Sequence, residues 1–346
     1  MKARLTVEKL SPYVCARDLY KEAKIFLDAN ENSLGSTAEF QGVELNRYPD
    51  PEAMELKKEL AKYCGVNTGE ILVGNGSDEI ISLVINTFAE KGDNIISIEP
   101  GYSMYGISAQ VAGVEPRIAT LLPDYSFNVD KVLEKVDGNT KLIMFPYPNS
   151  VVGNAVTEKQ IVELLEKFKG IVFVDEAYFE FYGKTAVPLL KKYNNLIISR
   201  TFSKAWGLAA VRVGYCISNK AVISAIRKIK LPYNVGAVSQ ALAVQAMKNR
   251  EKMEQYVAEI KKQREWLSAQ LTLLELQVFP SVVNFVTIKL PDKYNSRQVQ
   301  GKLAERGIIV RDRSSLPLMQ NCIRITIGKP GENALLIQEL KKILEK

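Results

Sequence analysis

The chain has 346 residues with a formal net charge of +7, and 47% of its residues are apolar and 25% charged. These proportions are ordinary for a globular protein, and the length allows a large domain with a sizeable core and a smaller second domain. Apolar runs stay well short of the roughly 18 residues that a transmembrane helix needs, and the stretch MKARLTVEKLSPY lacks the apolar centre of a signal peptide. We therefore expect a cytoplasmic protein that does not bind membranes.

The positive charge does not by itself predict nucleic-acid binding. The lysines are scattered and interleaved with glutamates, as in KNREKMEQ (248–255), which is typical of solvated helix faces. The four cysteines lie far apart without a CxxC pair, which favours reduced thiols over disulfides or a zinc site. Because the chain contains no histidine, acid–base chemistry must use a tuned lysine, carboxylate or tyrosine, and Ser-His-Asp triads and most transition-metal sites are excluded.

From about residue 70, short apolar segments alternate with segments whose apolar residues recur at helical spacing. Helices are predicted at 77–92, 129–136 and 157–170, of which the last has a Thr N-cap and stops at a glycine. Strands that are fed by such crossover helices form a mostly parallel, buried sheet. The predicted strands are 69–75, 94–100, 114–120, 141–149, 170–178, 195–201 and 211–218.

The last part of the chain has a different pattern. After about residue 250, a long charged helix is followed by strand, helix, strand, strand and a final helix, which predicts a smaller α+β domain at 251–346. Residues 41–250 then form the large domain. The first 40 residues are too short for a domain, and we expect them to pack on the small domain. The predicted elements of the tail are NFVTIKL (284–290), RQVQGKLAERG (297–307), IIVRD (308–312) and CIRITIG (322–328).

Ligands of open parallel sheets bind beyond the C-terminal ends of the strands, and several predicted strands here end in polar residues. The segment GNGSDE (74–79) separates a strand from a helix, and its small residues allow a backbone to approach an anion at the helix N-terminus. It lacks the third glycine of a dinucleotide fingerprint, and by itself Ser77 and Asp78 are equally consistent with helix caps.

Asp175 ends the apolar strand IVFVD. A carboxylate on a buried strand is costly unless it is paired. One interpretation is therefore a cap or a salt bridge. The other is a counter-ion for a positively charged heteroaromatic ring, with Tyr178 donating to an oxygen of the same ligand.

The segment SRTFSKAWGLAAVR (199–212) places Lys204 just after an apolar strand. A free lysine has a pKa of about 10.4 and is protonated at neutral pH, but partial burial and a nearby cation such as Arg212 would lower that value. An activated amine forms Schiff bases with carbonyl compounds, including pyridoxal phosphate. Thr201, Ser203 and Arg212 would then hold the phosphate together with the helix start. One cofactor accounts for the lysine, the aspartate, the hydroxyls and the arginine.

Seven segments of the chain are each unspecific alone, but their joint order and spacing are specific. They are LDANENSLG (27–35), NRYPDP (46–51), GNGSDE (74–79), PGYSMY (100–105), VDEAYFEF (174–181), TFSKAWGLAAVRVGY (201–215) and IRITIG (323–328). With them, almost the whole chain resembles the fold-type I pyridoxal-phosphate aminotransferases, and within these the histidinol-phosphate aminotransferases. The resemblance implies an α/β fold whose large domain has a mostly parallel seven-stranded sheet flanked by helices, followed by a small α+β C-terminal domain.

The resemblance also implies roles for residues around the cofactor, pyridoxal 5'-phosphate. Lys204 forms the Schiff base and moves the proton between Cα and C4′, while Asp175 pairs with the pyridinium nitrogen. Tyr178 hydrogen-bonds the phenolic oxygen, and Tyr102 stacks on the ring. The groups expected around the phosphate are those of Ser77, Asp78, Thr201, Ser203 and Arg212, and Tyr48 of the neighbouring subunit, which implies a homodimer.

Four further residues would face the substrate: Tyr13, Asn30, Arg311 and Arg324. The two arginines suit bidentate capture of a phosphate or of the carboxylates of a keto acid. The chain departs from the family pattern at one point, where PNSVVG (148–153) replaces the usual PNNPTG or PNAPTG. We expect Asn149 to contact the phenolic oxygen, and Ser150, which occupies the slot before the usual PTG, is the alternative.

The expected reaction is transamination between L-histidinol phosphate and 2-oxoglutarate, which gives imidazole acetol phosphate and L-glutamate. Two alternatives of the same fold are a threonine-phosphate decarboxylase and an aromatic-amino-acid aminotransferase. A non-catalytic binding module, such as a nucleotide-binding domain or the effector domain of a regulator, is disfavoured because the segment before the core leaves no room for a DNA-binding unit. The expected partners are small-molecule substrates and a second copy of the chain, with no nucleic acid.

Overall fold

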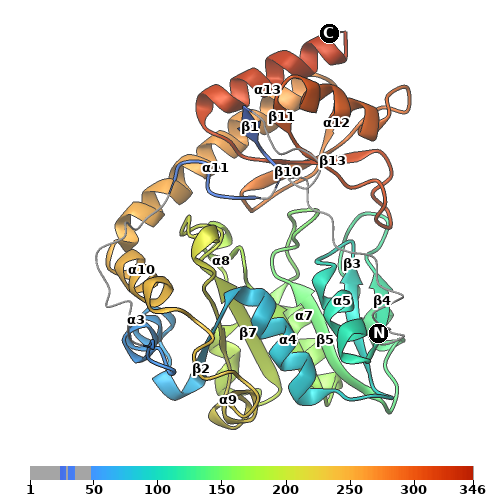
Figure 1. Ribbon diagram of the computed structural model, residues 1–346. Helices are drawn as coiled ribbons and strands as arrows, with labels where there is room; N and C mark the ends of the chain where they lie inside the picture. Colours follow the sequence, from blue (N-terminus) through green and yellow to red (C-terminus); the bar gives the residue numbers. More distant parts are fainter. Residues whose placement is uncertain (1–23, 29, 36–47, 346) are drawn as a thin grey trace, which may run out of the picture.

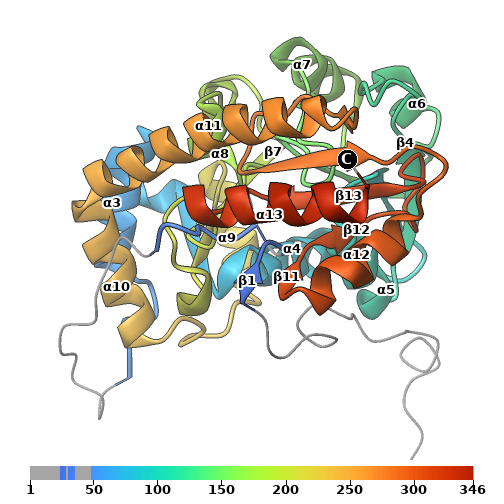
Figure 2. The same ribbon diagram turned by 90° about the horizontal axis from the view of Figure 1, so that it is seen from above.

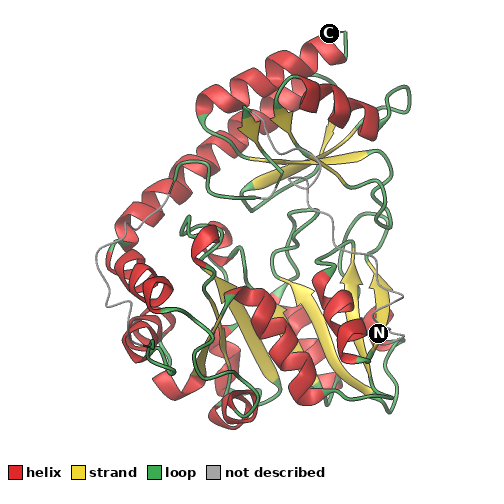
Figure 3. Ribbon diagram, viewed as in Figure 1, coloured by secondary structure: helices red, strands yellow, loops and turns green. Residues whose placement is uncertain are grey.

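The computed structural model describes residues 24–28, 30–35 and 48–345 (Figure 1). The predicted role of Tyr13 lies outside these residues. Two sheets lie one above the other in the view of Figure 1, and helices cover both of them (Figure 3). Within the described ranges, every helix is too short or too polar to span a lipid bilayer.

The larger sheet has seven strands in the order β2-β8-β7-β6-β5-β3-β4. Neighbouring strands from β4 to β7 pair in parallel, whereas β8 runs antiparallel between β2 and β7. The prediction of a mostly parallel seven-stranded sheet is therefore confirmed. Its strands are β2 (Ile71–Gly74), β3 (Asn94–Glu99), β4 (Glu115–Thr120), β5 (Thr140–Pro146), β6 (Ile171–Asp175), β7 (Leu196–Thr201) and β8 (Gly214–Ile217).

Both faces of this sheet are buried except along the edge strand β4, which is mostly exposed. This burial explains why the other strands read as largely apolar runs. Successive side chains point to opposite faces, so Met144 belongs to one apolar cluster and Phe145 to the other. One cluster includes side chains of α4 (Gly76–Phe88), α5 (Met104–Ala112) and α9 (Lys220–Arg227). The other includes side chains of α3 (Met54–Cys64), α6 (Val129–Leu133), α7 (Glu158–Lys167), α8 (Phe179–Tyr182) and α10 (Ala237–Lys248).

The smaller sheet has four antiparallel strands in the order β12-β13-β10-β9. The long helix α11 (Arg250–Leu273) runs from the larger sheet to the smaller one, where it lies beside α13 (Pro330–Ile343) (Figures 1 and 2). The strands are β9 (Gln277–Val278), β10 (Phe285–Lys289), β12 (Arg311–Asp312) and β13 (Cys322–Thr326), and the remaining helix is α12 (Ser296–Glu305). The exact domain boundaries at residues 41 and 250 stay a prediction.

The described part of the N-terminal segment joins this smaller unit. Strand β1 (Ile25–Phe26) pairs in parallel with β11 (Ile308–Ile309), and the backbone N–H of Thr326 donates to Leu27 at 3.1 Å. These contacts carry the following residues, Asp28 and Asn30, to the edge of the smaller sheet.

Two predicted strands differ from the structure. The segment 211–218 is extended only from Gly214, because Arg212 has a left-handed backbone with φ of 54°, which interrupts an extended chain. The segment 308–312 splits into β11 and β12, because its first half pairs with β1 and its second half with β13. The sequence pattern of one apolar run does not reveal this change of partner.

Gly214 of β8 lies directly against the first turn of α4. An added Cβ would lie 2.4 Å from the backbone nitrogen of Ser77 and 2.5 Å from the carbonyl carbon of Gly76. Both neighbours are backbone atoms, which have little freedom to move away. The absence of a side chain therefore allows α4 to begin at the edge of the sheet.

We predict that Gly214→Ala destabilises the protein by about 1–3 kcal/mol, because the new methyl group overpacks the contact with α4. Gly301→Ala is the control, since Gly301 lies inside α12 with nothing within 4 Å of its added Cβ, and alanine there adds about 0.5–1 kcal/mol of helix stability. Urea unfolding measures both changes. Equal effects of the two substitutions would contradict the close approach.

Candidate active site

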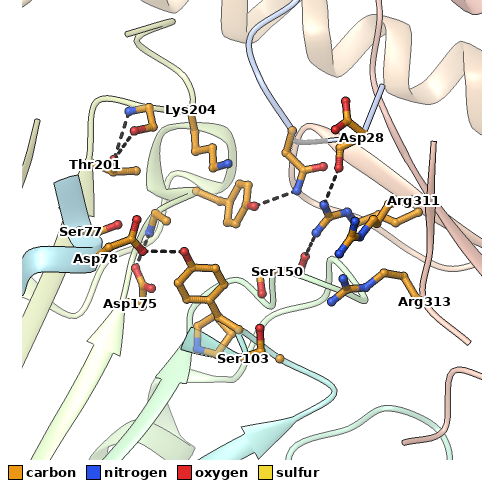
Figure 4. Close-up of a pocket in the computed structure, with 18 of the residues that line it drawn as sticks. Asp28, Ser77, Asp78, Ser103, Ser150, Asp175, Thr201, Lys204, Arg311 and Arg313 are labelled. Atoms are coloured by element: carbon orange, nitrogen blue, oxygen red, sulfur yellow. Dashed lines mark hydrogen bonds between the residues drawn. The ribbon is translucent and has the colours of Figure 1, made fainter. Parts of the chain in front are cut away.

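One cavity brings together most of the predicted site residues, as Figure 4 shows. It lies between the C-terminal ends of strands β6 and β7, the start of α4, and the strands β12 and β13 of the smaller sheet. Its lining includes the predicted residues Asn30, Ser77, Asp78, Tyr102, Asp175, Tyr178, Thr201, Ser203, Lys204, Arg212, Arg311 and Arg324. Tyr48 and Asn149 are not part of this lining.

Asp175 is the last residue of β6, and only 3% of it is exposed. One carboxylate oxygen accepts from the Tyr105 hydroxyl at 2.8 Å, and the other accepts from the Ser199 hydroxyl at 2.9 Å and from the Ala177 backbone at 3.2 Å. Burial raises the pKa of Asp175 to about 6, although the three donors oppose this effect. A cation in the cavity would stabilise its ionised form.

The start of α4 faces a group of hydrogen-bond donors. Asn75 provides no side-chain cap for the helix, so the first-turn N–H groups are available to an anion. Arg212 lies opposite, within 3.2 Å of the Asp78 carboxylate and 3.3 Å of the Ser203 hydroxyl. The Thr201 hydroxyl is 3.0 Å from that of Ser203. We call the first turn of α4 with Thr201, Ser203 and Arg212 the anion cradle.

Glycine keeps this cradle open. Gly76 has a φ of 76°, and a Cβ added there would lie 2.5 Å from a terminal nitrogen of the Arg212 guanidinium. A larger residue at position 76 would therefore displace the arginine. The Asp78 side chain, which accepts from the Tyr102 hydroxyl at 2.6 Å, orients both Tyr102 and Arg212.

Lys204 enters the same cavity from the loop after β7. Its ammonium nitrogen lies 5.8 Å from the centre of the Tyr178 ring. The Tyr178 hydroxyl accepts from the Asn30 side chain at 2.9 Å, and the Asn30 side-chain oxygen accepts from the Thr326 hydroxyl at 3.0 Å. Asn30 therefore links a tyrosine beside the larger sheet to strand β13 of the smaller one.

Arginines line the opposite end of the cavity. Arg311 and Arg324 face each other in the register of β12 and β13. The guanidinium of Arg324 donates to the backbone oxygens of Ser150 at 2.8 Å and Asp28 at 2.9 Å, which fixes its orientation. Arg313 also lines the cavity. This positively charged end suits an anionic substrate group.

The loop after β5 places Ser150, rather than Asn149, in the cavity. The Asn149 side chain donates to the Pro100 oxygen at 2.8 Å and accepts from the backbone of Val151 and Val152 at 2.8 and 2.9 Å. It thus holds the shape of the loop. Ser150 lines the cavity, and its hydroxyl oxygen is buried with no hydrogen-bond partner among the described residues. The predicted contact between Asn149 and a ligand stays a prediction, and this geometry favours Ser150.

Arg313, Tyr105 and Ser199 are site residues that were not predicted from the sequence. Arg313 had a signal, because two arginines two residues apart in RDR (311–313) share one side of an extended segment. Tyr105 and Ser199 had none, since they contact Asp175 from α5 and β7, elements that only the tertiary fold brings together.

The arrangement fits a phosphorylated, cationic ring that carries an aldehyde. The anion cradle offers N–H, hydroxyl and guanidinium donors to a phosphate, and the enclosed Asp175 carboxylate offers its charge to a ring nitrogen. Lys204 supplies the amine. Pyridoxal 5'-phosphate combines these features in one molecule.

We predict that Asp175 destabilises the cofactor-free protein at neutral pH. Because its pKa is raised in the folded state, its contribution to stability is present below about pH 4 and is lost as the pH rises through about 6. Asp175→Asn, which keeps the shape, should therefore gain roughly 2 kcal/mol relative to the parent between pH 4.5 and 7.5. Denaturant unfolding of both cofactor-free proteins measures this gain, and a stability difference that is the same at both pH values would contradict it.

Known proteins resemble the chain over nearly its whole length. The family model of aminotransferase class I and II matches residues 23–340. A histidinol-phosphate aminotransferase of Flavobacterium johnsoniae is 43% identical and is aligned over 98% of this chain and 96% of its own length. One of Caldanaerobacter subterraneus is 39% identical over 93% of each chain.

A solved structure supports the fold. The histidinol-phosphate aminotransferase of Sinorhizobium meliloti, in complex with pyridoxal-5'-phosphate, superposes with a TM-score of 0.90 and covers 99% of this chain and 98% of its own. Its sequence identity is 22%, so this likeness concerns the fold. With the family model matched from residue 23 to residue 340, the chain belongs to the class I and II aminotransferases.

Proposed function

We propose that the chain transfers the amino group of L-histidinol phosphate to 2-oxoglutarate, with pyridoxal 5'-phosphate as cofactor. The observation that carries this proposal is the convergence of Lys204, the buried Asp175 and the anion cradle on one cavity whose other end is lined by arginines. The names of the two relatives at 43% and 39% identity support the choice of substrate. The products are imidazole acetol phosphate and L-glutamate, and we place the reaction in the cytoplasm.

In this proposal, the anion cradle holds the cofactor phosphate. The first turn of α4 contributes backbone N–H groups, and Thr201, Ser203 and Arg212 contribute side-chain donors. The Asp78 carboxylate would repel a phosphate, so this residue contributes its backbone and orients Arg212. Tyr178 and the buried Ser150 hydroxyl are the groups suited to a phenolic oxygen, and Tyr102 supplies a ring face.

When bound, the cofactor supplies a carbonyl carbon for the amine and a ring that draws electrons away from the substrate Cα. Lys204 takes the proton from this Cα, since the chain contains no histidine for that task. Asp175 is ionised and holds a proton on the ring nitrogen. Its donors Tyr105 and Ser199 keep the carboxylate in place.

The arginine end of the cavity accepts both substrates in turn. One carries a phosphate and the other two carboxylates, and guanidinium groups pair with either. Arg324 is preoriented by two backbone oxygens, so it needs little reorganisation on binding. Arg311 and Arg313 add charge at the same end.

A second copy of the chain completes the site in this proposal. Tyr48 is 80% exposed and stacks on Tyr233 with ring centres 4.4 Å apart. Met54, Ile229 and Leu231, which are close to this pair in sequence, are exposed as well. An exposed apolar patch of this kind marks an interaction surface, and Tyr48 on it would reach the cofactor phosphate of the partner.

An assay with matched substrates tests the proposed function. Purified protein is given L-histidinol phosphate and 2-oxoglutarate, and glutamate is measured by mass spectrometry. Threonine phosphate and aromatic amino acids are offered in parallel. Carbon dioxide released from threonine phosphate, or faster transfer from an aromatic amino acid, would favour one of the two alternative activities instead.

We predict that Lys204→Ala retains bound pyridoxal phosphate but transfers amino groups slower by at least three orders of magnitude, roughly the size of a lost general base. Absorbance measures the bound cofactor, and glutamate release measures the rate. Borohydride reduction followed by peptide mass spectrometry should label position 204 of the parent protein alone. A variant that transfers at near-normal rate would refute the role of this lysine.

We predict that Tyr48→Phe weakens pyridoxal phosphate binding about tenfold, the cost of one hydrogen bond to a charged group. Tyr233→Phe is the control, because it alters the stacking partner without removing a proposed phosphate contact. Mixed dimers of Tyr48→Phe and Lys204→Ala chains should need the same pyridoxal phosphate concentration for activity as the parent, since one of their two sites has both the lysine and the tyrosine. Mixed dimers that need the tenfold higher concentration of the Tyr48→Phe protein would show that Tyr48 acts within its own subunit.

A further inference from the structure

Lys230 lies in the segment that follows α9, and its side chain binds both backbone and side-chain oxygens of the protein. Its ammonium donates to the backbone oxygens of Leu231 at 2.9 Å and Pro51 at 3.0 Å, and to the side-chain oxygen of Asn234 at 3.0 Å. An ammonium has three donors, and each has an oxygen within reach. Lys230 therefore joins two segments that lie far apart in the sequence.

Asn234 passes this contact on to the anion cradle. Its side-chain nitrogen donates to Glu79 at 2.7 Å and to the backbone oxygen of Val73 at 3.3 Å. The same Glu79 oxygen accepts the backbone N–H of Asn75, the residue that precedes α4. Glu79 therefore fixes the backbone of the residue before the helix, which sets the direction in which the uncapped N–H groups of the first turn face the cavity.

The segment that contains Tyr48 is held by Lys230 and by a further hydrogen bond from Gln240. Gln240 donates to the backbone oxygen of Asp50 at 2.9 Å, next to the Pro51 oxygen that Lys230 binds. The Tyr48 ring stacks on Tyr233 with an angle of 15° between the ring planes. Residues 48–51 and 230–240 are thus held together at several points.

We propose that Lys230 and Asn234 are positioning residues that fix the start of α4 and the Tyr48 segment in one frame. Through Glu79 they orient the first turn of the subunit's own anion cradle, and through Pro51 they hold the tyrosine that serves the partner's cradle. This inference rests on the proposed function, in which the cradles bind the cofactor phosphate. It predicts that replacing either residue weakens binding of the cofactor phosphate and leaves binding of the rest of the cofactor unchanged.

Titrations of cofactor-free protein with pyridoxal phosphate and with pyridoxal, which lacks the phosphate, test the inference. We expect Lys230→Met to raise the dissociation constant for pyridoxal phosphate about tenfold, a typical size for coupling between neighbouring sites, and to leave that for pyridoxal unchanged. Lys228→Met is the matched control, because this lysine is exposed two residues earlier and should change neither constant. Equal losses for both ligands, or none, would overturn the inference.

A second variant keeps the test decisive if Lys230→Met does not fold. Asn234→Asp keeps the shape and the acceptor for Lys230, but it replaces the donor to Glu79 by a second carboxylate. We expect the same selective loss of pyridoxal phosphate binding, and a folded variant with an unchanged ratio of the two dissociation constants overturns the inference. A parent protein that binds no pyridoxal phosphate would instead refute the proposed function.

Discussion

The charge of Asp175 is the constraint on which the site depends. The carboxylate ends a central strand, is almost fully buried, and takes its hydrogen bonds from a helix, a neighbouring strand and the backbone. These donors hold it in place but supply no positive charge, so burial still raises its pKa. A cationic ring that enters the cavity provides the missing charge. The charge pair between Asp175 and the ring therefore favours binding of the cofactor and also increases the electron withdrawal by its ring.

The remaining groups are placed by the meeting of two sheets. Parallel strands deliver Asp175, Thr201 and the loop of Lys204 to one edge of the larger sheet, and this edge is where open α/β sheets bind ligands. The smaller sheet delivers Arg311 and Arg324 from the other side. Since the backbone oxygen of Ser150 binds Arg324, the loop after β5 sets the position of a substrate-binding group on the opposite sheet.

Much of this arrangement follows from the sequence. Apolar runs between helical patterns predicted the strands, and the spacing around Lys204 and Arg212 predicted a shared ligand, because both features depend on local sequence. The contacts of Tyr105 and Ser199, and those of Lys230 and Asn234, join residues that are close only in the folded chain. Such contacts cannot be predicted from a single sequence. The change from β11 to β12 within one apolar run, and the inward position of Ser150 instead of Asn149, are likewise set by neighbours that are distant in sequence.

The two-residue pairing of β1 with β11 has a consequence for biosynthesis. Ile25 pairs in register with Ile308, so this contact closes a loop between residues 25 and 308. During translation the ribosome must release most of the chain before the pairing is possible, while the larger sheet already has its strands by residue 217. Asn30 and Asp28, which follow β1, are consequently held beside the cavity only after residue 309 has become available for this pairing.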